Sequence, residues 1–161
     1  EWCATQFATN KIGIILVNIN PSYRLHNLEY VLSQSGCKAI VIAPQFKTSN
    51  YTQMLYDLCP ELHRCEPGKL ESASVPDLTT IIRIGSEPSA GMFTRDEVMA
   101  FGEKVQDNKL TARQNELELD EPVNVQYTSG TTGFPKGATL SHHNILNNGY
   151  FVGDTVSQLK M

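Results

Sequence analysis

The chain has 161 residues, of which 40% are hydrophobic and 19% charged, and its formal net charge is −4. This length is enough for one domain with a buried core, and the composition is ordinary for a globular protein. The acidic balance gives no reason to expect nucleic acid or an anionic membrane as a partner. The longest apolar run, residues 12–17, is too short to be a transmembrane segment.

The chain begins at Glu1 rather than at a methionine, and its last residues carry no helix-terminating signal. We therefore expect the chain to be a piece of a longer protein. Its cysteines have neither the density of a disulfide framework nor a C-x-x-C pair, which predicts reduced thiols in an intracellular protein. They are Cys3, Cys37, Cys59 and Cys65. Although Cys59, His63 and Cys65 lie close together, no second pair with zinc-like spacing follows, so no metal site is predicted.

The first third of the chain has the pattern of an α/β unit. Residues 14–19 form a near-continuous apolar run, typical of a strand buried on both faces of a parallel sheet. Leu25, Leu28 and Leu32 then recur at helical spacing, which predicts an amphipathic helix. A second apolar run at residues 38–43 predicts another strand. Together these segments predict a β-α-β unit with a right-handed crossover.

The middle of the chain continues the alternation. Residues 50–58 predict a second helix, and residues 78–84 predict a further strand. Thr94 and Glu97 have capping-box spacing, so a short helix is expected to begin there. The polar residues 104–120 predict a helix followed by an extended linker. The whole pattern predicts an α/β fold with a mostly parallel sheet flanked by helices.

The stretch most indicative of a ligand follows Val123, Val125 and Tyr127, whose alternation predicts a strand. Its glycines permit positive φ and close approach of backbone N–H groups to an anion, and its hydroxyls can donate to phosphate oxygens. Lys136 adds a mobile positive charge suited to a polyphosphate. The residues predicted to bind phosphate are Thr128, Ser129, Gly130, Thr131, Thr132, Gly133, Phe134, Pro135 and Lys136.

This loop differs from a Walker A loop, which would have a glycine at Pro135 and a hydroxyl at Gly137. Residues 138–140 predict a second short strand, so the loop is expected in a β-turn-β setting. Residues 142–149 predict the start of a helix. From composition alone, a solvated hairpin turn is the alternative interpretation.

The ordered string at residues 127–137, Y-T-S-G-T-T-G-F-P-K-G, resembles the phosphate-loop signature of adenylate-forming enzymes. That superfamily includes acyl-CoA synthetases, luciferases and the adenylation domains of peptide synthetases. The blocks at residues 14–21, 28–32 and 141–148 are similar to fatty-acyl-CoA synthetases, and flanking residues look like their medium-chain, mitochondrial members. The resemblance extends over essentially the whole chain.

The resemblance implies a two-step ligase for fatty acids. A carboxylate attacks the α-phosphate of ATP to give an acyl adenylate and pyrophosphate, and the thiol of CoA then displaces AMP. It further implies that the loop and Lys136 hold the β- and γ-phosphates, with Mg²⁺ sharing their charge. His142 is implied to lie near the acyl-adenylate pocket, with helix capping or packing as the alternative role.

The resemblance implies that residues 1–161 are an incomplete N-terminal AMP-binding domain, with the C-terminal domain absent. Later nucleotide-binding motifs of the family are missing from these residues, so the intact protein is expected to be the enzyme and the chain by itself to be inactive. Two other functions remain open from the sequence. The protein could be an adenylate-former that passes its acyl group to another acceptor or oxidises it. It could also be a binding or interaction module that keeps the α/β shell without chemistry.

Overall fold

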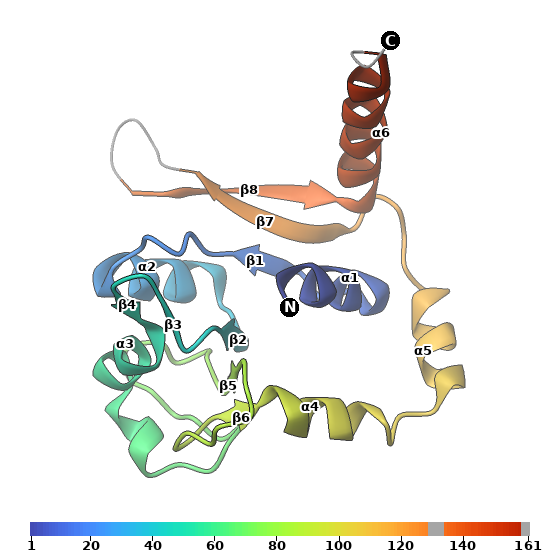
Figure 1. Cartoon of the computed structure of the whole chain (residues 1–161). Coiled ribbons are helices and arrows are strands. Elements are labelled where there is room, and N and C mark those ends of the chain that lie inside the picture. The colour runs from blue at the N-terminus through green and yellow to red at the C-terminus, as the bar shows by residue number, and fades with distance from the viewer. Residues whose placement is uncertain (129–133, 159–161) are drawn as a thin grey trace. The chain divides into compact units, whose positions relative to one another are not determined.

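The computed structural model of the protein describes residues 1–128 and 134–158 (Figure 1). The chain divides into two compact units. Unit 1 is formed by two separate stretches, Glu1–Asn18 and Gln106–Met161, and unit 2 is the stretch between them, Ile19–Val105.

Unit 1 is built on a sheet with the strand order β1-β7-β8. The bounds of its strands are Leu16–Asn18 for β1, Pro122–Thr128 for β7 and Lys136–Ser141 for β8. Strand β1 is parallel to β7, with Leu16 opposite Asn124, and β7 is antiparallel to β8. The helices of this unit are α1 (Trp2–Ile12), α5 (Asp107–Gln114) and α6 (His142–Gln158).

The two stretches of unit 1 are joined by hydrogen bonds as well as by the sheet. Gly13 ends α1 with φ 70°, and the carbonyl of Ile12, just before it, accepts from Arg113 Nε of α5 at 3.0 Å. Asn124 is fully buried in β7, and its Nδ2 donates to Gln6 Oε1 of α1 at 3.3 Å. These contacts connect residues more than a hundred positions apart in the sequence.

Unit 2 contains a parallel sheet of strand order β2-β5-β6 and a small antiparallel pair, β3-β4. Its strands are β2 (Ala39–Ile42), β3 (Gln45–Phe46), β4 (Ser49–Asn50), β5 (Thr80–Arg83) and β6 (Phe93–Thr94). Its helices are α2 (Leu25–Ser35), α3 (Tyr51–Leu58), the 3₁₀ helix η1 (Pro60–His63) and α4 (Arg95–Gly102).

Unit 2 also holds most of the buried apolar side chains. Leu32 of α2, Leu55 of α3, Leu62 of η1 and Ile81 of β5 are each at most 1% exposed and pack in one cluster. Each such side chain contributes about 1.5–3 kcal/mol by its removal from water. Two helix ends lie where the sequence predicts: Gly36 closes α2 in the left-handed conformation, and Thr94 and Glu97 form a reciprocal capping box at α4. The 3₁₀ helix η1 was not predicted.

The predicted α/β class and its mostly parallel pairing are confirmed. The predicted β-α-β unit is wrong, because β1 pairs with β7 whereas β2 pairs with β5, in different sheets. Nor is the first apolar run buried on both faces, since Ile14 and Ile15 are 52% and 47% exposed. Within the part of the chain that the structure describes, no helix has the length and apolar character needed to cross a membrane.

Candidate functional site

The predicted phosphate loop connects the two longest strands of unit 1, and the expected β-turn-β setting is confirmed (Figure 1). The β7–β8 ladder runs from Pro122 opposite Ser141 to Thr128 opposite Lys136. Thr128 and Lys136 therefore flank the loop directly across from each other, and Thr128 Oγ1 donates to the Lys136 carbonyl at 3.4 Å. Thr128 is the last residue of β7 and Lys136 the first residue of β8, so the two residues lie at the strand ends that the loop joins.

Of the remaining predicted loop residues, the structure describes two. Phe134 is 55% exposed and Pro135 is half-buried just before β8 begins. The other predicted residues lie outside the described part of the chain. These are Ser129, Gly130, Thr131, Thr132 and Gly133.

Lys136 is the first residue of β8 and is exposed. Among the described residues, no carboxylate forms an ion pair with its ammonium group, whereas Lys38 and Lys69 each have an acidic partner. A lysine at the mouth of a loop with its charge uncompensated in this way can bind an anion without first breaking a salt bridge.

Gly137 follows Lys136 and has a packing role that the sequence does not reveal. A Cβ atom at this position would lie 2.9 Å from Val125 Cγ1 and 3.3 Å from Tyr127 Cζ. Gly137 does not use the positive φ that a glycine permits, since it is not among the glycines with a left-handed backbone. Tyr127 is its cross-strand partner, so the lack of a side chain at Gly137 leaves room for the Tyr127 ring.

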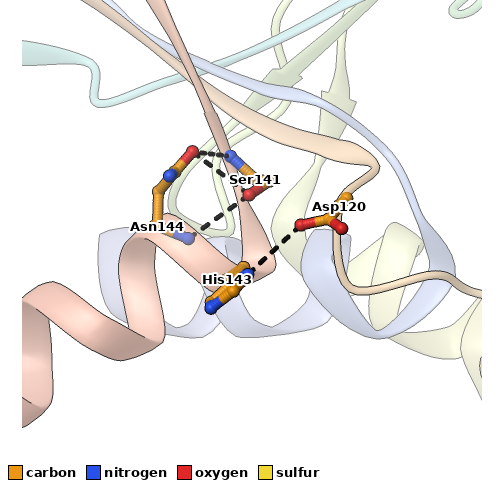
Figure 2. A network of polar contacts seen from close by, with 4 residues as sticks. All are labelled: Asp120, Ser141, His143 and Asn144. Atoms are coloured by element: carbon orange, nitrogen blue, oxygen red, sulfur yellow. Dashed lines mark hydrogen bonds and ion pairs between the residues drawn. The ribbon is translucent and has the colours of Figure 1, made fainter.

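His142 is half-buried at the first position of α6, immediately after β8. The polar network at this junction is made by its neighbours (Figure 2). Asn144 Oδ1 accepts from Ser141 N at 2.9 Å and from Ser141 Oγ at 3.1 Å, and Asn144 N donates to Ser141 Oγ at 3.3 Å. His143 Nδ1 lies 3.3 Å from Asp120 Oδ1.

Sequence reasoning missed this network, although part of its signal was present. Ser141 and Asn144 have the same spacing as the Thr94–Glu97 capping box that was predicted, with an amide in place of a carboxylate. The contact between Asp120 and His143 has no such signal, since the two residues lie 23 positions apart on either side of the hairpin.

Of the neighbouring Cys59, His63 and Cys65 in unit 2, the two cysteines pack in the core and His63 is exposed. Cys59 is fully buried, and burial raises the pKa of its thiol, which disfavours the thiolate that a metal or a nucleophilic role would require. His63 stacks on Tyr56 with ring centroids 4.2 Å apart. Among the described residues, no group of three or more His, Cys, Asp or Glu side chains is arranged to hold a metal ion.

Comparison with known proteins gives the family. The model of the AMP-binding enzyme family matches residues 1–160, and the chain belongs to this family. It is 50% identical over 161 residues to the mitochondrial medium-chain acyl-CoA ligase of Rattus norvegicus, covering 99% of this chain and 26% of that protein. With the corresponding human ligase the identity is 46% over 168 residues, covering 99% and 27%.

Among solved structures, a fatty acyl-CoA synthetase of Mycobacterium tuberculosis superposes with a TM-score of 0.55 at 18% identity. The match covers 88% of this chain and 22% of that one, and it shows the fold. The chain thus spans about a quarter of the length of the curated relatives it matches.

Proposed function

We propose that the chain is part of the N-terminal domain of an AMP-forming acid–thiol ligase that converts a medium-chain fatty acid to its acyl-CoA through an acyl adenylate. The observation that carries this proposal is the identity to medium-chain acyl-CoA ligases over nearly the whole chain, which includes the strand-loop-strand segment. The mitochondrial location in the names of these relatives supports the same location here.

In this proposal the β7–β8 hairpin supplies the phosphate-binding part of the ATP site. The Lys136 ammonium and the Thr128 hydroxyl, which lie opposite each other where the strands meet the loop, would donate to the β- and γ-phosphates together with N–H and hydroxyl groups of residues 129–134. Pro135 has no N–H and would shape the loop without donating. Donors fixed before the reaction stabilise the negative charge that develops on the pyrophosphate leaving group. His142 would face the acyl-adenylate side of the site from the start of α6.

Mg²⁺ is the group that such a reaction needs besides its substrates, and it would share the phosphate charge. The described donors near the loop are a hydroxyl and an ammonium rather than carboxylates, so they fit direct contact with phosphate better than a metal ion. Adenine, ribose, CoA and the metal would be held by residues of the intact protein beyond this chain. The chain by itself is therefore expected to be inactive.

The test is ATP–pyrophosphate exchange by the intact enzyme with a medium-chain fatty acid, in the wild type and in Lys136→Ala. Loss of a charge-assisted hydrogen bond costs about 1.5–3 kcal/mol, so kcat/KM for ATP should fall on the order of ten- to a hundredfold. Lys109→Ala is the matched control, because Lys109 is exposed on α5, away from the hairpin in sequence. Equal rates for Lys136→Ala and the wild type would remove Lys136 from the mechanism.

The acyl acceptor is tested separately by following AMP and acyl-CoA formation against a panel of carboxylic acids. A CoA ligase releases AMP only when CoA is present and yields a thioester. Adenylate formation without thioester formation would favour an adenylate-former with another acceptor, and no adenylation of any acid would favour a non-catalytic module.

A further inference from the structure

Strand β8 carries Lys136 and, like β1, lies at an edge of the sheet of unit 1. In the sheet order β1-β7-β8, β7 has a partner on each side, whereas β8 pairs with β7 alone among the described strands. A slip of one residue along an edge strand turns each side chain to the opposite face of the sheet. Such a slip would carry Lys136 away from its position opposite Thr128.

The backbone ladder is least regular at the end away from the loop. The register shifts by one residue between Pro122 and Asn124, so Val123 has no residue opposite it. Pro122, which faces Ser141, has no N–H to donate to the ladder. The ladder therefore constrains Ser141 less than the residues paired with 124–128, and an additional connection at this end can add to it.

Side chains just beyond the two strands form that additional connection, which we call the base clamp: Asp120, Ser141, His143 and Asn144 (Figure 2). Asp120 precedes β7 and His143 follows β8, so their 3.3 Å contact ties one strand end to the other. Next to it, His143 N donates to the Leu119 carbonyl at 3.0 Å. The reciprocal Ser141–Asn144 bonds fix the residue at which β8 ends and α6 begins.

We propose that Asp120 and Asn144 are positioning residues, which lock the register of β8 through the base clamp and thereby hold Lys136 opposite Thr128. The clamp and Lys136 lie at opposite ends of β8, about 17 Å apart for five residues of strand. The functional part of this inference rests on the proposed role of the hairpin in binding ATP. The structural part, that the clamp sets the register, does not.

Register is measured directly by cross-linking. Gln126 and Ala138 are exposed and opposite each other, so Gln126→Cys/Ala138→Cys should form a disulfide on mild oxidation, to be identified by mass spectrometry. Gln126→Cys/Thr139→Cys reports a slip of one residue. In the intact protein, removing the clamp with Asp120→Ala/Asn144→Ala should lower the yield of the 126–138 disulfide and raise the yield of the 126–139 disulfide. If both form as in the clamped protein, the proposal is wrong.

The functional readout is the KM for ATP in pyrophosphate exchange. Loss of a helix cap costs typically about 1 kcal/mol, so we expect KM to rise about fivefold in the Asp120→Ala/Asn144→Ala protein. The single variant Asn144→Asp keeps Asp120 and an acceptor oxygen for Ser141, so its KM for ATP should equal that of the wild type. Asn147→Ala is the matched control, since Asn147 is exposed on the same helix.

The oxidised Gln126→Cys/Ala138→Cys pair separates a register effect from general destabilisation. In the protein without the clamp, closing this disulfide should return the KM for ATP to within about twofold of the wild-type value, and reduction should reverse it. A KM that stays high after the disulfide closes would overturn the proposal. Absence of exchange in the wild type would instead contradict the proposed function, and cross-linking would still test the clamp.

Discussion

Replacing Gly137 by alanine tests the packing of the hairpin that carries the predicted phosphate loop. Nonbonded carbon atoms are at their optimum about 3.5–4.0 Å apart. The new Cβ would lie 2.9 Å from Val125 Cγ1, so the Val125 methyl or the strand backbone must move by about 0.5 Å or more. The Tyr127 ring, at 3.3 Å, can rotate, but Val125 is β-branched and stiff.

The expected magnitude follows from two opposing terms. Overpacking costs about 1–3 kcal/mol, and the lower chain entropy of alanine returns about 0.5–1 kcal/mol. The Gly137→Ala protein should therefore lose about 0.5–2 kcal/mol in free energy of unfolding. Gly149→Ala makes the same chemical change in α6, where no described atom beyond the adjacent residues and the helix's own backbone lies within 4 Å of the added Cβ. That variant should gain about 0.5–1 kcal/mol.

Urea denaturation followed by circular dichroism measures both variants under one set of conditions. The midpoint urea concentration reports the change in stability when the dependence of the free energy of unfolding on urea is unchanged. A changed dependence would indicate an altered denatured state. Opposite shifts for the two glycines are expected. A stability of Gly137→Ala equal to or above that of the wild type would show that the hairpin tolerates a side chain there and would refute the close-packing argument.

Three further predictions concern unit 2. The Thr94 backbone N–H and hydroxyl lower the pKa of the Glu97 carboxyl, so its stabilisation is complete above the unfolded pKa of about 4.3 and is lost as pH falls through the lower folded pKa. The free energies of unfolding of Glu97→Gln and the wild type, measured from about pH 2 to about pH 7, should differ at neutral pH and converge at acid pH. A difference that stays constant with pH would contradict this role of Glu97. Buried Cys59 should resist iodoacetamide in the native protein while exposed Cys3 reacts, and equal labelling by mass spectrometry would exclude this burial. Ile81→Ala should lower the free energy of unfolding by about 2–5 kcal/mol in urea, and a loss below about 1 kcal/mol would show that Ile81 is outside the tight core.

Local signals in the sequence predicted the elements well, because each depends on residues a few positions apart. Gly36 ends a helix because glycine adopts the left-handed conformation readily, and Thr94 and Glu97 cap one because their spacing matches a helical turn. The same holds for the strand-loop-strand at Thr128 and Lys136.

What the sequence could not give was pairing between distant segments. The run around Leu16 pairs with Asn124, and nothing in its apolar pattern distinguishes that partner from β2, the strand next to follow it. Asp120 and His143 meet only because the hairpin brings its two ends together. The close contact at Gly137 depends on which residues lie opposite it in β7. Composition suggested that this glycine provides backbone flexibility, whereas in the structure it leaves room for neighbouring side chains.

The division of unit 1 into two stretches has a consequence for the order of folding. Strand β1 is synthesised before its partner β7, which begins about a hundred residues later, at Pro122. Closing so long a loop is entropically costly and slow relative to local contacts. Unit 2 is continuous in sequence and has its own apolar cluster, so it can fold first. We expect α1 and β1 to remain without their sheet until the hairpin has left the ribosome.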